Sequence, residues 1–215
     1  MTIDYSQARE LMVEQQVRPW DVLDLRVLDV LARMPREAFV AQAHRALAYA
    51  DMELPLGHGQ KMMKPVVEGR MLQALDLQPS DEVLEIGTGS GFISACLGDL
   101  ARDVLSLEIQ PELADAARAR LEAAKLGSNI RIEVADALNW QTQRHFDAVC
   151  VTAAVDTVPN QFLQWLRPGG RLFVIQGTSP VMQALLVKAD GSTESLFETD
   201  IDYLQGAAPA PHFQL

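Results

Sequence analysis

Three glycines in alternate positions follow directly after a short apolar stretch, and they are the residues of this chain most suited to chemistry. Residues 81–91 read Asp-Glu-Val-Leu-Glu-Ile-Gly-Thr-Gly-Ser-Gly, with Thr88 between the first two of the glycines Gly87, Gly89 and Gly91. A glycine run after a buried strand lets backbone N–H groups and a following helix N-terminus approach a bound molecule, because no Cβ stands in the way. The pattern therefore predicts a ligand-binding turn between a strand and a helix.

The spacing of the glycines and the neighbouring charge indicate the class of ligand. A dinucleotide fingerprint would require a third glycine at position 92, where the chain has Phe92. Glu85, two residues before the first glycine, would repel a pyrophosphate and attract a cationic or hydrogen-bond-donating group. S-Adenosylmethionine carries an ammonium, a sulfonium and two ribose hydroxyls, which all favour acidic or acceptor side chains. We therefore expect S-adenosylmethionine, with S-adenosylhomocysteine as its product form, rather than NAD.

Two further acids follow later apolar stretches of the strand type. Glu108 stands roughly 20 residues after the glycines, where folds of this kind bind ribose hydroxyls. Asp136 follows the next stretch and could accept a hydrogen bond from the adenine amino group. Their neighbours Ile109 and Ala137 are expected beside the same ligand. Taken singly, each acid is equally consistent with a solvated strand end, and the glycines are consistent with a tight turn. The three acids Glu85, Glu108 and Asp136 together favour ligand binding.

Strand-type stretches alternate with helical patterns from residue 81 onward, and this alternation predicts the fold. It implies parallel strands with helices on both faces of a sheet. We predict an α/β, doubly wound, mostly parallel Rossmann-like sheet with an N-terminal helical cap and antiparallel C-terminal strands, the last two in a hairpin around Asp190-Gly191. The expected strands are 81–86, 103–108, 130–134, 147–152, 171–176, 181–188 and 194–203, and the expected helices between them begin near 92, 111 and 159.

The N-terminal part of the chain carries helical patterns that prolines interrupt. A helix is expected from the N-cap Ser6 to about residue 17, and a second near 23–34. Residues 41–60 are expected to be irregular, and a further helix begins at Pro65. We expect three regions, which are a cap and loop region at 1–78 packed on the main domain, a ligand-binding domain at 79–205 and a flexible tail at 206–215.

Composition and charge argue against several classes of function. The chain has 215 residues, of which 48% are hydrophobic, enough for one good core and one domain with an appendage. Its formal net charge of −11, without a local basic patch, would repel a phosphate backbone, so nucleic acid is not an expected partner. The sequence shows neither a basic, apolar leader nor a run of about 18 apolar residues, so we expect a cytoplasmic protein without a membrane partner.

The residues that bind metals or react covalently are sparse. Cys96 and Cys150 lie in apolar stretches and are expected to be buried, reduced thiols. The 4 histidines lack the spacing of metal ligands, so no metal site is expected. His58, between two glycines, could orient a substrate carboxylate or simply occupy a turn. Thr152, at the end of a strand, could contact the ligand or satisfy a backbone group.

Several blocks of the sequence are similar to those of one enzyme family. The blocks are Met-Val-Glu-Gln-Gln at 12–16, Met-Pro-Arg-Glu-Ala-Phe-Val at 34–40, Leu-Ala-Tyr-Ala-Asp at 47–51, Gly-His-Gly-Gln at 57–60, 83–91, Val-Thr-Ala-Ala at 151–154 and Leu-Arg-Pro-Gly-Gly-Arg-Leu at 166–172. They span about residues 10–176, and through them the chain resembles the protein-L-isoaspartate O-methyltransferase family. The glycine motif alone would fit most methyltransferases of this fold, whereas Leu-Ala-Tyr-Ala-Asp and Gly-His-Gly-Gln are much more specific.

The resemblance implies an activity and a set of roles. Enzymes of this family methylate the α-carboxylate of isoaspartyl residues in damaged proteins, which begins their repair. The implied partner is therefore a protein or peptide acceptor. The implied donor contacts agree with those expected from the residues, with Glu85 and the glycines at the methionine part, Glu108 at the ribose, and Asp136 and Ala137 near the adenine.

The acceptor side departs from the family pattern. After Gly-Gln the family typically has Thr-Ile-Ser-Gln-Pro, whereas residues 61–65 here read Lys-Met-Met-Lys-Pro, which puts Met63 at the position of the family's serine. A thioether cannot donate a hydrogen bond but packs well against apolar or aromatic groups, so the preference of the pocket would change. Lys61 and Lys64 could attract an anionic acceptor or simply be solvated, and Met63 and His58 are the candidate acceptor-side residues.

Three hypotheses about function follow. The leading one is S-adenosylmethionine-dependent O-methyl transfer to a carboxylate, with isoaspartyl protein or peptide as acceptor. A carboxylate is already an anionic nucleophile, so positioning and desolvation rather than a general base would supply most of the catalysis. The second is a methyltransferase with a small-molecule acceptor, such as a small carboxylate, and the third is a non-catalytic protein that binds S-adenosylmethionine. The sequence does not define an oligomeric state.

Overall fold

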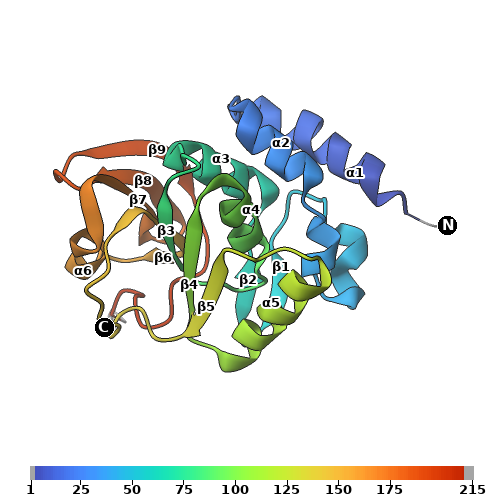
Figure 1. Ribbon diagram of the computed structural model, residues 1–215. Coiled ribbons are helices and arrows are strands. Elements are labelled where there is room, and N and C mark those ends of the chain that lie inside the picture. Colours follow the sequence, from blue (N-terminus) through green and yellow to red (C-terminus); the bar gives the residue numbers. More distant parts are fainter. Residues whose placement is uncertain (1–2, 211–215) are drawn as a thin grey trace, which may run out of the picture.

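One seven-stranded sheet forms the centre of the molecule in the computed structural model, which describes residues 3–210 (Figure 1). The strand order is β5-β4-β3-β6-β7-β8-β9, with parallel pairing from β5 to β7 and antiparallel pairing for the last two strands. The predicted fold class is confirmed. The strands are β3 (Glu82–Ile86), β4 (Asp103–Glu108), β5 (Ile130–Val134), β6 (Phe146–Val155), β7 (Leu166–Thr178), β8 (Val181–Lys188) and β9 (Thr193–Thr199).

Helices precede the sheet and connect its parallel strands. They are α1 (Tyr5–Met12), α2 (Leu25–Arg33), α3 (Pro65–Leu75), α4 (Phe92–Leu100), α5 (Pro111–Ala123) and α6 (Asn160–Gln164), with a π-helical segment at Val13–Val17 and 3₁₀ turns at Arg18–Trp20, Arg36–Phe39 and Gln42–Leu47. The predicted N-cap Ser6 was wrong, because the Asp4 carboxylate accepts hydrogen bonds from the Ser6 and Gln7 N–H groups and starts the helix earlier. Within residues 3–210, no helix is both long and apolar enough to cross a bilayer.

The two faces of the sheet are covered unequally. Successive strand residues point to opposite faces. Val83 of β3 therefore belongs to a large core shared with α1 to α5, while Leu84 belongs to a smaller core on the other side. On that second face the apolar cover comes from α6 and the residues around it, including Phe162 and Trp165, whose rings stack with centroids 5.4 Å apart. The thick, helix-rich side is the one that carries the N-terminal helices (Figure 1).

A buried ion pair links segments of the N-terminal region and packs against helix α4. Arg36 and Glu68 are 0% and 1% exposed, and the guanidinium donates through Nη1 to Glu68 Oε2. The same guanidinium donates to the carbonyls of Ala48 at 2.8 Å and Met63 at 2.7 Å, and it lies 4.9 Å from the centre of the Phe92 ring on α4. Buried residues before and after position 78 thus share one core, and the division into three regions stays a prediction.

Residues 41–60 are more regular than the sequence indicated. In addition to a 3₁₀ turn, the strands β1 (Leu54–Gly57) and β2 (Gln60–Met62) pair antiparallel in a separate two-stranded sheet. His58 and Gly59 connect them with φ values of 54° and 71°. Two successive positive φ values are what a tight hairpin turn requires, so the expected loop is a hairpin with His58 at its tip.

The chain after β9 returns to the middle of the sheet. The Ala154 N–H donates to the Asp202 carbonyl at 2.9 Å, and the Leu204 N–H donates to the Ala154 carbonyl at 2.7 Å, so this segment lies beside the end of β6. Of the tail expected at 206–215, residues 211–215 lie outside the described residues. Ala207, within the described part, accepts a hydrogen bond from the Asp156 N–H at 2.8 Å.

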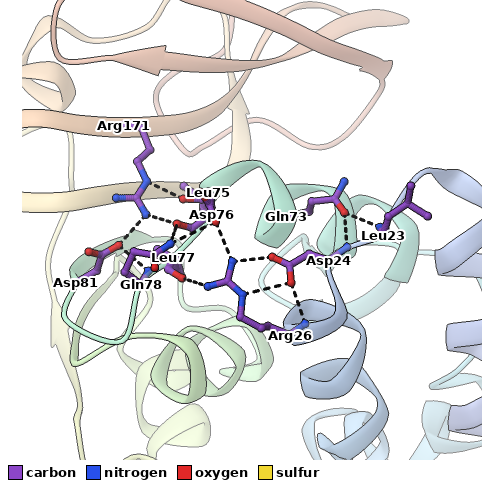
Figure 2. Close-up of polar contacts among 10 residues, drawn as sticks. All are labelled: Leu23, Asp24, Arg26, Gln73, Leu75, Asp76, Leu77, Gln78, Asp81 and Arg171. Atoms are coloured by element: carbon purple, nitrogen blue, oxygen red, sulfur yellow. Dashed lines mark hydrogen bonds and ion pairs between the residues drawn. The ribbon is translucent and has the colours of Figure 1, made fainter.

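Two arginines fix the end of α3 against its surroundings (Figure 2). Arg171 of β7 donates to the carbonyls of Leu75 at 2.6 Å and Asp76 at 2.9 Å, and to the Asp81 carboxylate at 2.7 Å. These carbonyls have no partner inside the helix, so the guanidinium satisfies them and its charge is favourable at a helix C-terminus. Arg26 of α2 binds the Leu77 carbonyl and the carboxylates of Asp24 and Asp76 from the other side.

Arg171→Ala should lower the free energy of unfolding by about 2–4 kcal/mol, because it removes the cation paired with Asp81 and leaves two helix-end carbonyls without their donor. Arg26→Ala is the matched control, since the Arg26 side chain is 46% exposed, and it should cost only about 1 kcal/mol. Urea unfolding followed by circular dichroism measures both. Equal losses in the two variants would contradict the role given to Arg171.

Candidate functional site

A cavity opens at the carboxyl ends of β3 to β6, where the strand order reverses. The chain runs from β3 to β4 and β5 in one direction, and β6 then lies on the other side of β3. Ligands of open α/β sheets bind at such a switch point. The cavity is a concave pocket that opens to solvent at its mouth, which is the usual form of a small-molecule site. The predicted site residues that line it are Met63, Gly87, Gly89, Glu108, Ile109, Asp136, Ala137 and Thr152.

The remaining predicted residues lie outside this cavity. Thr88 lines a smaller cavity that adjoins the first at the glycine turn. Gly91 caps α4 with a φ of 85° and packs toward Ala117, where an added Cβ would lie 3.1 Å from the Ala117 Cβ. Glu85 and His58 line neither cavity. The glycine turn, the acids after β4 and β5 and the end of β6 therefore come together, whereas Glu85 and His58 lie apart from them.

Neighbouring strands hold the glycine turn in place. The Gly87 N–H donates to the Leu107 carbonyl of β4 at 2.8 Å, and Thr152 Oγ1 of β6 donates to the Gly87 carbonyl at 2.6 Å. A Cβ at Gly87, whose φ is 95°, would overlap the Thr152 hydroxyl. Thr152 thus satisfies a backbone group and lines the cavity, so both alternatives for it agree with the structure.

Glu108 links the turn to the next strand end. It is 4% exposed, and its carboxylate accepts hydrogen bonds from the Gly89 N–H at 2.8 Å and the Gln110 N–H at 3.0 Å, one on each oxygen. Each carboxylate oxygen has a further lone pair, so hydroxyl donors in the cavity can still bind it. The fixed orientation suits recognition of a pair of neighbouring hydroxyls.

Asp136 forms a local turn at the end of β5. Its carboxylate accepts from the Leu138 N–H at 2.9 Å and from Asn139 Nδ2 at 2.6 Å. These bonds orient the carboxylate while Asp136 and the buried Ala137 line the cavity. A cationic or donor-bearing ligand would meet acceptors at both Glu108 and Asp136.

Glu85 lies beneath the glycine turn. Side chains alternate along β3, and the Glu85 side chain points toward α4. Its Oε2 accepts hydrogen bonds from Ser94 Oγ of α4 and Ser106 Oγ of β4, both at 2.5 Å. Thr88 Oγ1 lies 2.5 Å from Ser106 Oγ and extends this polar group to the turn. Burial raises the pKa of Glu85 to about 8; the two serine hydroxyls oppose the rise and the Glu108 carboxylate adds to it. Glu85 therefore holds a proton at neutral pH.

Two carboxylates that the sequence patterns did not indicate line the cavity near Lys61. Lys61 of β2 reaches the carboxylates of Glu53 at 3.3 Å and Asp202 at 3.1 Å, and all three residues line the cavity together with Met63. Glu53 was hidden in a segment expected to be irregular, and Asp202 follows β9. Their approach depends on long-range packing, for which the local pattern holds no signal. Met63 is 6% exposed and belongs to the core as well as to the cavity wall.

His58 lies outside both cavities, at the tip of the β1–β2 hairpin. The His58 side chain is 39% exposed at the hairpin tip, and its Nε2 lies 4.0 Å from Glu112 Oε2 of α5. Within residues 3–210, no group of three or more His, Cys, Asp or Glu side chains is arranged to hold a metal ion.

Comparisons with known proteins agree with this architecture. A Plasmodium falciparum structure, described as a protein-L-isoaspartate O-methyltransferase in complex with S-adenosyl-L-homocysteine, matches with a TM-score of 0.80 at 16% identity, over 94% of this chain and 99% of that one. The sequence is 40% identical over 189 residues to "Protein-L-isoaspartate O-methyltransferase 1" of Syntrophobacter fumaroxidans, covering 87% of both chains. It is 42% identical over 195 residues to the Picosynechococcus protein-L-isoaspartate O-methyltransferase, covering 90% of this chain and 86% of that one.

The fold is that of the Rossmann-like methyltransferases, with the cavity at the switch point of the sheet. The family profile described as Protein-L-isoaspartate(D-aspartate) O-methyltransferase matches residues 7–205. The chain therefore belongs to the protein-L-isoaspartate O-methyltransferase family, as the resemblance predicted.

Gly87→Ala should lower the free energy of unfolding by about 3 kcal/mol, because it combines a disfavoured positive φ with a clash against Thr152. Gly169→Ala is the matched control, with a φ of 79° and no heavy atom within 4 Å of the added Cβ, and it should cost about 1 kcal/mol. Urea unfolding measures both. The clash would be excluded if Thr152→Ala failed to restore any stability to Gly87→Ala.

The raised pKa of Glu85 predicts a loss of stability with rising pH. The unfolded carboxyl ionises near its usual 4.5, whereas the folded one keeps its proton to about 8, so the folded state binds more protons in between. Stability should then fall by up to about 1.4 kcal/mol per pH unit in this range. Burial also raises the pKa of Glu68, to about 7, so Glu68 contributes to the same dependence, and a variant is needed to separate the two carboxyls.

Urea unfolding at pH 7.0, 7.5 and 8.0 tests this dependence. Glu85→Gln should make the decrease of the free energy of unfolding with pH shallower. Glu112→Gln, which removes an exposed carboxylate, should leave this slope unchanged. The same slope in wild type and Glu85→Gln would show that Glu85 does not titrate there.

Proposed function

We propose that this chain is an S-adenosylmethionine-dependent O-methyltransferase that acts on a carboxylate, with isoaspartyl residues of proteins or peptides as the acceptor. Relatives at about 40% identity carry this activity in their names. The observation that carries the proposal is the joint position of Glu108, Asp136 and the glycine turn around one cavity. These groups fit a ligand that presents hydroxyls, an amino group and positive charge.

The residues of the chain have separable tasks in this reaction. Glu108 accepts hydrogen bonds from the ribose hydroxyls, and Asp136 and Ala137 lie at the adenine. The bound sulfonium supplies an electrophilic methyl group, and the acceptor carboxylate displaces it without needing a general base. The protein therefore has to align the two reactants and exclude water, which is the larger part of the catalytic effect for such a displacement.

Lys61 is the residue that we assign to the acceptor. Among the described residues that line the main cavity it is the single cation, and it faces the carboxylates of Glu53, Glu108, Asp136 and Asp202. An incoming carboxylate needs a positive partner in this field. Lys61 is in β2, and Met63 follows directly after that strand. The Lys61 ammonium can exchange one of its two acidic partners for the acceptor carboxylate.

A second candidate function has one observation in its favour. Met63 forms the cavity wall where the resemblance places a serine, and with Leu56 and Ile201 it gives this side an apolar surface. A small-molecule acceptor with an apolar body would pack there. A cytoplasmic location remains part of the proposal and agrees with two buried, unpaired cysteines.

An assay with methyl-labelled S-adenosylmethionine and an isoaspartyl peptide tests the proposal. A base-labile methyl ester should form on the isoaspartyl peptide and not on the matched aspartyl peptide. Donor binding by calorimetry without any ester, even at high enzyme concentration, would contradict isoaspartyl transfer and favour the second candidate.

Lys61→Met should raise the KM for the isoaspartyl peptide by about tenfold, because it removes the cation and exposes the acceptor to two unpaired acids. The affinity for S-adenosylhomocysteine should change less than twofold. Lys64→Met is the matched control, since Lys64 lines neither cavity, and its KM should stay at the wild-type value. Equal KM values for the two variants would remove Lys61 from the acceptor site.

A further inference from the structure

The smaller cavity adjoins the main one across the glycine turn. The two share the wall formed by Leu56, Met63, Gly89 and Thr152, and the smaller one continues over Thr88 and Ser90 toward α3. A ligand whose nucleoside lies in the main cavity, near Glu108 and Asp136, can therefore extend a chain of a few atoms into the smaller one.

Glu68 is the acid of this smaller cavity. It is 1% exposed and comes from the first turn of α3. Its Oε2 accepts from Arg36, but its Oε1 is buried without any hydrogen-bond partner. A buried carboxylate oxygen without a donor is costly, so this atom is suited to accept a hydrogen bond from a bound molecule.

Nearby protein groups do not supply the missing donor. The Arg36 guanidinium is shared among the carbonyls of Ala48 and Met63 and Oε2 of Glu68. Lys61 also lines the smaller cavity, but its ammonium binds the carboxylates of Glu53 and Asp202. Burial raises the pKa of Glu68 to about 7. The Arg36 charge opposes this rise, and the Asp51 carboxylate adds to it. A further cation beside Glu68 would therefore be favourable.

We propose, on the basis of the function above, that Glu68 Oε1 accepts a hydrogen bond from the α-ammonium of the methionine part of the donor. The nucleoside then occupies the main cavity and the amino acid part occupies the smaller one. This assigns to Glu68 the contact that the sequence pattern suggested for Glu85. Glu85 Oε1 also has no hydrogen-bond partner, but Glu85 lines neither cavity, and its Oε2 binds Ser94 and Ser106 beneath the turn.

The test combines one variant with two ligands. Calorimetry measures the dissociation constants of S-adenosylhomocysteine and of its analogue without the α-amino group, for wild type and Glu68→Gln. In the variant, Arg36 engages the single amide oxygen, which leaves an NH₂ group facing the ammonium. S-Adenosylhomocysteine should then bind about tenfold to a hundredfold more weakly, while the affinity for the deamino analogue should change less than twofold.

Controls separate this contact from other causes. Glu112→Gln removes one exposed carboxylate and should leave both dissociation constants unchanged. Thermal unfolding reports whether Glu68→Gln folds; if it does not, Arg36→Met with Glu68→Leu removes both partners, and the preference for the amino group should again be lost.

Three outcomes are distinguishable. If wild type binds neither ligand, the proposed function itself fails. If both ligands bind and Glu68→Gln weakens them equally or not at all, the ammonium contact is wrong while donor binding stands. A rise in the KM of the isoaspartyl peptide alone would place Glu68 on the acceptor side and overturn the assignment.

Discussion

The buried pair of Arg36 and Glu68 determines how the other parts of the site are arranged. Burying two charges is costly, and additional hydrogen bonds to the buried groups offset part of that cost. Arg36 donates such bonds to the carbonyls of Ala48 and Met63, whereas Glu68 Oε1 has no partner among the described residues. The backbone before α3 is thereby fixed, and with it the wall between the two cavities. Arg36 and Glu68 precede the strands of the central sheet in the sequence, and they thus help to set the shape of the cleft at the ends of those strands.

Much of the fold was predictable because the parallel strands are apolar on both faces. Such strands read as short continuous runs, and β4 was predicted with the bounds that it has in the structure. The bounds of β5 were also predicted correctly, although in that strand Arg131 and Glu133 alternate with apolar residues. The C-terminal hairpin around Asp190-Gly191 was confirmed for a similar reason, since its turn residues are distinctive. Glu108 and Asp136 could be placed at one sheet edge because the carboxyl ends of parallel strands meet there.

The rest depended on information that local patterns do not contain. Glu85 stands beside the glycines in sequence, but strand alternation directs its side chain under the turn. Glu53 and Asp202 reach the cavity through the short hairpin β1–β2 and the segment after β9, which contact each other only in the folded chain. Helix starts were also displaced where two capping residues competed, since Asp4 rather than Ser6 begins α1. Expected bounds agreed with the structure for β4 and β5, but β7 begins at Leu166 rather than 171, and β9 ends at Thr199 rather than 203.

The return of the chain to β6 after β9 has a consequence for biosynthesis. Leu204 and Gln205 line the main cavity together with residues from β1 to β6, so the cleft includes parts from early and late in translation. A ribosome-bound chain that has emerged only through β7 contains the glycine turn and the acids but not this closing segment. The complete wall of the cleft can therefore form only after residues up to 205 have been synthesised and the last segment has joined β6.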